Sequence, residues 1–489
     1  MRLRLIFTAL ALGASLAGTN APVATADEAC GDFVREVRQR IEADYVGYSL
    51  AVRPDNARLT AWQEFSAARI TEAEAEPRAE CTFIAQSLVG WFDDPHLFLI
   101  ENVEVSEDEA DALRAAAPVS DLASLAAPTT EDPLAGDWVM AQTGIRIAPE
   151  PASGSQSWIA VVTSSGDDSW KPGDVIATFA MRDGVLWATL RRGADRAKVR
   201  RRAVLQRDGH FLHMAPQTWA RRASSVASPA YDPAEPRAPL FADLGNGAVL
   251  VSLASMDPRH SGALSALLSE HGAKIAQSRL LIIDLRANEG GSSTMAAPLL
   301  PYIVSQESKP SLAVPAYPIA VSSPAMQRYY QSLRDQYPAG PERDMMDDFL
   351  RRMEAAPGTL VPWFLDRNAA AGIMAAPPVA PFEGGPAAIA ILTDEDTVSA
   401  AEAFRLDTGR STRVTVFGAP TGGSIDYQSV AMFEVGGGQL RHLIGFPTMA
   451  WSDEVATRGL NATGIPVDVP LATGSDWIGQ VLAHYGIGD

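Results

Sequence analysis

The feature that most constrains the fold is a run of five residues, 280–284, that is apolar up to its last position. A strand of this composition is buried on both faces, as in a parallel sheet packed between helices. The same type of run recurs at residues 249–253, 387–392 and 414–416. A helix is expected between the first two strands, at residues 262–275. From Phe241 onward the sequence therefore predicts an α/β domain.

The chain of 489 residues is too long for one compact core, so several domains are expected. Apolar residues recur at helical spacing before Phe92. Short apolar runs separated by Gly, Asp and Ser follow residue 138 and are typical of a small antiparallel β module. We predict a signal peptide at 1–26, a helical domain at 27–130, the β module at 131–235 and the α/β domain at 236–489. An insertion at 310–386 is a candidate cover for the α/β domain.

The first residues predict export from the cytoplasm. Arg2 and Arg4 precede an apolar stretch at 5–16, and Ala24-Thr25-Ala26 fits a small-residue cleavage site after Ala26. The apolar stretch is too short to span a bilayer, and no later segment is long and apolar enough to do so. A periplasmic or secreted protein without membrane insertion is expected.

Cysteine content and net charge exclude some classes of metal site and binding partner. The chain has two cysteines, Cys30 and Cys81, and in an oxidising compartment they are expected to form a disulfide. Two cysteines are too few for a thiolate zinc site, and no metal or organic cofactor is expected. The net charge of −19 argues against nucleic acid and anionic membranes as partners.

Ser399 lies between an apolar strand-like run and a helix-like segment at 400–407. The N-terminus of a helix favours negative charge, so this position suits a nucleophile. The same residues also fit a capping box, in which Ser399 caps the helix and Glu402 reaches back to the Ser399 N–H. Both interpretations stay open at this point.

The segment 284–293 follows the strand at 280–284 and contains the pair Gly290-Gly291. Ligands of α/β sheets bind beyond the carboxyl ends of the strands. Glycines let main-chain N–H groups approach a substrate oxygen closely, as an oxyanion hole requires. A plain turn and a phosphate-binding loop are the alternatives, although neither Gly-Lys-Ser nor Gly-x-Gly-x-x-Gly is present.

Two further segments complete the candidate site. His96 follows Asp93-Asp94-Pro95, a rigid turn that would fix its position, although a lone histidine more often has a structural role. The loop 418–427 follows the strand after Ser399 and carries Thr421 and Asp426, which are expected to support the site.

Together these segments resemble the tail-specific (C-terminal processing) serine peptidase family. Residues 284–291 are similar to its oxyanion-side motif, 397–402 to its nucleophile motif and 418–423 to the loop that follows. Residues 464–469 are similar to its terminal signature, with Val467 in place of a proline. The resemblance implies a crotonase-like catalytic core, with the β module in the position of a PDZ domain.

The resemblance also implies residue roles. Many members use a Ser-Lys dyad, but the lysines of this chain are at 171, 198, 274 and 309, and none follows Ser399. The tricorn-like and retinoid-binding-protein-like branch instead implies Ser and His, with an acidic residue near the terminal signature. There this chain has Asn461, which could orient a histidine. Alternative acids are Glu402, Asp426 and Glu454.

We therefore expect an exported serine endopeptidase that acts on peptide or protein substrates. Ser399 would be the nucleophile and His96 the general base, with Gly290 or Gly291 and the Ala400 amide as the oxyanion hole. The alternative is a non-catalytic protein that binds an apolar ligand or a peptide on the same scaffold, an idea that the missing lysine favours. The third catalytic residue and the oligomeric state stay open.

Overall fold

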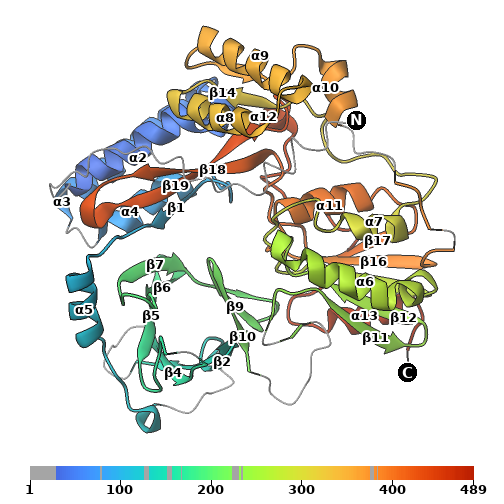
Figure 1. Ribbon diagram of the computed structural model, residues 1–489, viewed down its shortest axis with the longest axis horizontal. Coiled ribbons are helices and arrows are strands. Elements are labelled where there is room, and N and C mark those ends of the chain that lie inside the picture. Colours follow the sequence, from blue (N-terminus) through green and yellow to red (C-terminus); the bar gives the residue numbers. More distant parts are fainter. Residues whose placement is uncertain are drawn as a thin grey trace.

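The computed structural model describes residues 29–76, 80–125, 132–150, 157–166, 168–222, 231–232, 235–374, 379–382 and 384–488. The predicted signal peptide, residues 1–26, and its cleavage site lie outside these ranges. Three sheets organise the described chain, and each has its own helices or its own closed core (Figure 1). No helix in the described ranges is long and apolar enough to cross a membrane.

The predicted α/β domain is present as a six-stranded sheet. In spatial order its strands are β11 (Leu240–Gly245), β12 (Ala248–Ser252), β13 (Leu280–Asp284), β16 (Ala388–Thr393), β17 (Val414–Gly418) and β20 (Val469–Pro470). All neighbouring pairs are parallel except β11 and β12. The carboxyl ends of β12, β13, β16 and β17 therefore lie along one edge.

Side chains at alternating positions along the strands are buried on both faces of this sheet. Val251, Ile283 and Ile391 pack with α6 (Ser261–Ala276) and α11 (Ala400–Thr408) on one face. Residues of opposite parity pack with α13 (Trp477–His484) on the other face. Each such buried side chain contributes about 2 kcal/mol to folding. The resulting rigid sheet fixes the loops at its edge.

The β module is a nine-stranded antiparallel sheet that nearly closes on itself (Figure 1). Its strands are β2 (Gly136–Met140), β3 (Thr143–Pro149), β4 (Ser157–Ser164), β5 (Val175–Arg182), β6 (Val185–Arg191), β7 (Lys198–Arg202), β8 (Val204–Gln206), β9 (Phe211–Met214) and β10 (Gln217–Arg221). Asp183 and Gly184 join β5 to β6 with φ of 49° and 77°, as a two-residue hairpin turn requires. The predicted barrel-like module is confirmed.

The N-terminal helices share a core with distant parts of the chain. The helices are α2 (Cys30–Asp44), α3 (Asn56–Ala75) and α4 (Cys81–Gly90), and they lead into β1 (Phe98–Glu101). Strand β1 pairs with β19 (His442–Ala450), which also pairs with β18 (Tyr427–Val435). One hydrophobic cluster joins these elements to the insertion. This pairing brings the segment just before β1 to the α/β domain.

The insertion contributes α8 (Pro324–Gln336) and α9 (Pro341–Ala355) to that shared core. The Tyr330 hydroxyl donates to the Thr448 carbonyl of β19 at 2.9 Å. We call the elements that share this core the N-terminal lobe: α2 to α4, β1, β18, β19, α8 and α9. The predicted cover is thus a packed part of the N-terminal lobe. The remaining elements are α5 (Glu107–Ala115), α7 (Leu300–Ile303), α10 (Arg367–Met374), α12 (Val455–Arg458), β14 (Ile319–Val321) and β15 (Leu360–Pro362).

A disulfide joins Cys30, at the start of α2, to Cys81, at the start of α4, across 51 residues of sequence. Closing a loop of this length in the unfolded chain stabilises the folded state by roughly 4 kcal/mol. We predict that Cys30→Ala/Cys81→Ala lowers the urea midpoint of the N-terminal lobe. Reduced wild-type protein is the control, and its urea midpoint should equal that of the variant. An unchanged midpoint in both would contradict the prediction.

Candidate active site

The loops that follow β13 and β16 are joined at the carboxyl edge of the sheet. We call residues 285–291 the β13 loop, 394–399 the β16 loop and 419–426 the β17 loop. The Val398 N–H donates to the Asn288 carbonyl at 2.9 Å, which ties the β16 loop to the β13 loop. This edge is where α/β sheets bind their ligands.

Ser399 ends the β16 loop in a strained conformation. Its φ of 59° and ψ of −121° lie in a region that residues with a side chain rarely adopt. The Ser399 carbonyl accepts the first helical hydrogen bond, from Ala403, at 3.0 Å. Its N–H points to Glu402 Oε2 at 3.0 Å and to Ser424 Oγ at 2.6 Å. These bonds fix the backbone of Ser399 at the start of α11.

Glu402 is completely buried and holds the β17 loop against Ser399. Besides the Ser399 N–H, its carboxylate accepts from Thr421 Oγ1 at 2.5 Å, from the Gly423 N–H at 3.1 Å and from Ser424 N–H and Oγ at 2.7 and 2.9 Å. The predicted contact from Glu402 back to the Ser399 N–H is therefore present. Because five donors occupy this carboxylate, its contacts are those of a positioning group.

His96 lies in the turn between α4 and β1. Its N–H donates to Asp94 Oδ1 at 3.0 Å, which is the hydrogen bond of an Asx turn. Asp94 Oδ2 accepts from the hydroxyl of Tyr45, the residue that follows α2, at 2.7 Å, so the end of α2 also holds this segment. Burial raises the pKa of Asp94, and the charge of His96 opposes that rise.

The ring of His96 reaches Ser399 across 303 positions of sequence. His96 Nε2 lies 3.0 Å from Ser399 Oγ, and Nδ1 lies 2.6 Å from the main-chain carbonyl oxygen of Tyr427. A carbonyl can only accept a hydrogen bond, so Nδ1 carries the proton in this arrangement. In the neutral ring Nε2 then has a free lone pair that faces the serine hydroxyl.

Asn461 does not orient the histidine, contrary to expectation. Its side-chain oxygen accepts from the Asp426 N–H at 2.9 Å, and its own N–H donates to Asp426 Oδ2 at 2.7 Å. Across the described ranges, no ring nitrogen of His96 is bonded to Asn461, Asp426 or Glu402. The pair Asn461–Asp426 instead closes the β17 loop, and Glu454 forms an ion pair with Arg458.

The partner of His96 is the main chain of Tyr427, the last residue of the predicted loop 418–427, for which the sequence predicted no role. A main-chain carbonyl is available at every residue, so no residue type marks its use. Tyr427 is the first residue of β18, and the pairing of β18 with β19 holds its backbone opposite Ala450. The start of a strand after the predicted loop is therefore the only sequence signal that points to this position.

The two glycines of the β13 loop play different parts. A Cβ at Gly290, whose φ is 84°, would lie 2.6 Å from the Ser399 Cβ, so only glycine allows this approach. The Gly290 N–H is occupied, because it donates to Asn288 Oδ1 at 2.9 Å. Among the described residues, the N–H groups of Gly291 and Ala400 have no hydrogen-bond partner. These two amides, which follow Gly290 and Ser399 in the sequence, therefore stay available as donors.

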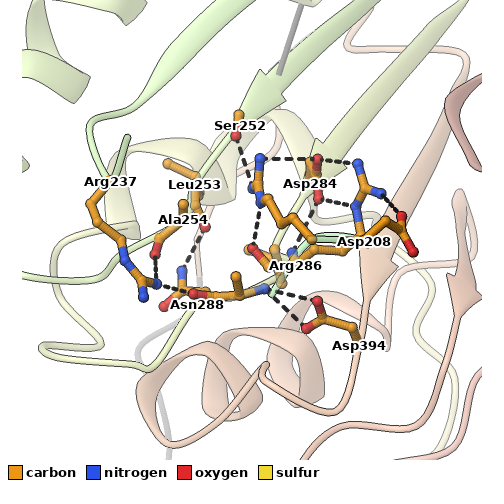
Figure 2. Close-up of polar contacts among 12 residues, drawn as sticks. Asp208, Arg237, Ser252, Leu253, Ala254, Asp284, Arg286, Asn288 and Asp394 are labelled. Atoms are coloured by element: carbon orange, nitrogen blue, oxygen red, sulfur yellow. Dashed lines mark hydrogen bonds and ion pairs between the residues drawn. The ribbon is translucent and has the colours of Figure 1, made fainter. Parts of the chain in front are cut away.

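Buried charges hold the β13 loop from below (Figure 2). Asp284 accepts from Arg286 at 3.0 and 2.9 Å and lies 3.6 Å from Arg207 of the β module. Burial alone would raise the pKa of Asp284, but Arg207 and Arg286 lower it to about 2. Both carboxylate oxygens of Asp394 accept from the Ala287 N–H at 3.0 Å.

Neither lysine of the α/β domain is at the site. Lys274 pairs with Asp243, and Lys309 donates to the Val414 carbonyl at 2.7 Å. His96 occupies the position beside Ser399, so the missing lysine no longer argues for a non-catalytic protein. In the part of the chain that the structure describes, no group of three or more His, Cys, Asp or Glu side chains could hold a metal ion.

Replacing Glu402 with Gln tests its positioning contacts. One acceptor oxygen becomes an NH₂ group that faces buried donors, and a buried polar group left unpaired costs roughly 3 kcal/mol. We predict a lower free energy of unfolding for Glu402→Gln. Glu434→Gln is the matched control at a half-exposed ion pair with Arg441 and should change stability little. Equal stability of Glu402→Gln and wild type would contradict these contacts.

Asp396 should make stability depend on pH. Burial, followed by the charge of Asp394, raises its pKa to about 7. A carboxyl with a raised pKa binds its proton more tightly in the folded state, so its stabilising contribution is lost as pH rises from about 4 to about 7. Asp396→Asn removes this loss, so the Tm of the variant relative to wild type should increase from pH 5 to pH 8.

Asp243→Asn is the control for this pH dependence. A hydrogen bond from Lys274 lowers the pKa of Asp243, so this carboxylate stays ionised across the same interval. The Tm of the control relative to wild type should therefore be constant between pH 5 and pH 8. A constant difference for Asp396→Asn as well would show that Asp396 titrates normally.

A comparison with protein families identifies a family for part of this chain. The model of peptidase family S41 matches residues 248–471, which include the strands β12 to β20 and every loop described above except the turn that carries His96. No curated protein sequence matches the chain significantly.

Solved structures with a similar course of the chain include three with low identity. The photosystem II D1 C-terminal processing protease is 13% identical (TM-score 0.31, covering 92% of this chain and 94% of that one). Mature CPAF is 10% identical (TM-score 0.41, 91% and 93%), and a lipoprotein from Streptococcus agalactiae is 12% identical (TM-score 0.35, 92% and 95%). Superpositions this loose add no argument. The match assigns residues 248–471 to peptidase family S41, so this chain contains a serine-type peptidase domain.

Proposed function

We propose that the protein is an exported serine endopeptidase with Ser399 as nucleophile and His96 as general base. The observation that carries this proposal is the distance of 3.0 Å between His96 Nε2 and Ser399 Oγ, with Nδ1 bonded to a carbonyl. This arrangement needs no rearrangement before proton transfer. Peptides or proteins are the substrates that the family implies.

The reaction follows from these contacts. His96 Nε2 takes the Ser399 proton while Oγ attacks the carbonyl carbon of the scissile peptide bond. The tetrahedral intermediate collapses, the C–N bond breaks, and the imidazolium gives its proton to the leaving amine. A water molecule, deprotonated by His96, then attacks the acyl-enzyme, and the proton returns to Ser399 Oγ as the acid product leaves.

The positive charge that forms on His96 needs support. The Tyr427 carbonyl accepts a hydrogen bond from the Nδ1–H group, and the dipole of this carbonyl favours the imidazolium. Asp94 supplies a nearby buried carboxylate, held by the Tyr45 hydroxyl and by the His96 N–H. In this proposal the pair Tyr427 carbonyl and Asp94 replaces the acid side chain that is usually bonded to a catalytic histidine.

The oxyanion hole would consist of the Gly291 and Ala400 amides. Both are free donors next to Ser399, and Ala400 is the first residue of α11, where the helix dipole favours negative charge. One such donor contributes roughly 3 kcal/mol to transition-state stabilisation. This assignment replaces Gly290 as a donor and keeps it as the close-packing residue. The crotonase-like core is part of the same proposal.

Export is supported by two features. The first 26 residues have the pattern of a secretory signal, and the disulfide between Cys30 and Cys81 suits an oxidising compartment. A periplasmic or secreted location follows from these features. The domain limits 27–130, 131–235 and 236–489 are carried forward as part of the proposal.

Labelling with a fluorophosphonate probe tests the nucleophile and the base. Wild type should be labelled, and Ser399→Ala should lose the label completely. His96→Ala should be labelled at least ~100-fold more slowly, because general-base catalysis contributes about 10²–10⁴-fold. His271→Ala, which removes a histidine stacked on Phe241 away from the site, is the matched control and should be labelled like wild type.

Two results would contradict the proposal. A folded wild type that is not labelled would remove Ser399 as an activated nucleophile. Labelling of His96→Ala at the wild-type rate would keep the nucleophile and exclude His96 as its base.

A further inference from the structure

Arg237 lies under the β13 loop, in the segment between β10 and β11. Its guanidinium group donates to the main-chain carbonyls of Ala254, at 3.0 Å, and of Ala287. Figure 2 shows Arg237 beside Ala254 and Asn288, opposite the carboxylate of Asp394. One side chain thus connects the segment after β12 with the loop after β13.

Ala287 is the strained residue of the β13 loop. Its φ is 59°, it is completely buried, and a left-handed conformation costs a residue with a Cβ roughly 1–2 kcal/mol. Charged side chains of opposite sign hold its two peptide groups. Asp394 accepts from the Ala287 N–H, and Arg237 donates to the Ala287 carbonyl. Strain of this kind persists only where the surroundings enforce it.

Asn288, the residue after Ala287, connects the Ala287 backbone to the residues around Ser399. Asn288 accepts from the Val398 N–H through its carbonyl and from the Gly290 N–H through Oδ1, both at 2.9 Å. Its Nδ2 donates to the Leu253 carbonyl at 2.7 Å. The orientation of the Ala287–Asn288 peptide therefore sets both the glycine pair and the residue before Ser399.

The β module supports Arg237 from the other side. Gln206 Oε1, at the end of β8, accepts from Arg237 at 2.9 Å, and His213 Nδ1, on β9, lies 3.1 Å away. The same two side chains hold Glu289 of the β13 loop, at 3.1 Å from Gln206 Nε2 and 2.9 Å from His213 Nε2. The end of the module at β8 and β9 is thus bonded directly to the loop of the site.

We propose that Arg237 is a positioning residue of the peptidase: it holds Ala287 in its left-handed conformation and thereby aims the oxyanion amides, with the β8–β9 end of the module as its support. The inference rests on the proposed function of Ser399, Gly291 and Ala400. It makes the β module a fixed part of the catalytic scaffold. The module then affects turnover through the β13 loop whether or not it binds peptide.

We call the hydrogen bonds from Arg237 to the Ala254 and Ala287 carbonyls the clamp. The test asks whether a glycine at position 287 makes the clamp unnecessary. Arg237→Gln removes the donors and should lower kcat for p-nitrophenyl acetate about 100-fold, the effect of misplacing a catalytic group by about 1 Å, with little change in KM. Glycine adopts positive φ without strain, so Ala287→Gly alone should be close to wild type. The double variant should recover at least ~10-fold of the lost kcat. Arg237→Lys, a milder change, should show a smaller loss and the same rescue.

Arg221→Gln is the matched control. Arg221 also donates to main-chain carbonyls, those of Gly209 and Ala135, but both belong to the β module. Its removal should lower Tm and leave kcat unchanged. Loss of kcat in Arg221→Gln equal to that in Arg237→Gln would reduce Arg237 to a general stabilising residue and overturn the proposal.

Amide hydrogen exchange separates this proposal from the proposed function. Faster exchange over residues 285–291 in Arg237→Gln, reversed in the double variant, supports the clamp even if wild type fails to hydrolyse the ester. Unchanged exchange overturns it. An active wild type with an equally active Arg237→Gln overturns the clamp alone, and so does a loss of kcat that Ala287→Gly does not rescue.

Discussion

The site depends on one hydrogen bond, from His96 Nδ1 to the main-chain carbonyl of Tyr427. It selects the tautomer that leaves Nε2 free to face Ser399 Oγ. The bond exists because β1 pairs with β19 and β19 pairs with β18, so that the turn before β1 meets the first residue of β18. The N-terminal lobe and the α/β domain are therefore joined at His96 itself.

Two strained residues share this edge of the sheet, and they are held in the same way. Ser399 and Ala287 both have a φ of 59°. In each case a buried carboxylate accepts from the strained residue's own N–H: Glu402 for Ser399, and Asp394 for Ala287. Both carboxylates lie within a short segment around the start of α11. This segment therefore fixes Ser399 and the facing loop together, and buried charge offsets the backbone strain.

The sequence predicted the parts of this architecture that residue type encodes locally. Apolar runs gave the parallel strands, and the Ser399–Glu402 spacing predicted a capping contact that the structure contains. The nucleophile and capping interpretations are compatible, because Glu402 binds the Ser399 N–H while the Ser399 hydroxyl lies 3.0 Å from His96 Nε2. The glycine pair was predicted to let main-chain N–H groups approach a substrate oxygen, and the structure adds that Gly290 packs closely against Ser399.

What the sequence could not predict depends on long-range pairing. Asn461 was expected beside His96 because an acid is common there, but the acceptor is a backbone atom without any signature in the sequence. The packing of the insertion against the N-terminal helices, and the contacts of Gln206, His213 and Arg237 with the β13 loop, also join segments far apart in the chain. Periodicity predicts elements, whereas these contacts depend on how the elements assemble.

The most direct test of this account is the tautomer of His96. Nitrogen NMR of protein labelled with ¹⁵N-histidine, with His96 assigned by comparison with His96→Gln, distinguishes the two ring nitrogens of a neutral imidazole. We predict a protonated Nδ1 and an unprotonated Nε2 in the neutral ring of the resting enzyme. A neutral ring with its proton on Nε2 would contradict the bond to the Tyr427 carbonyl and the role of His96 as a base.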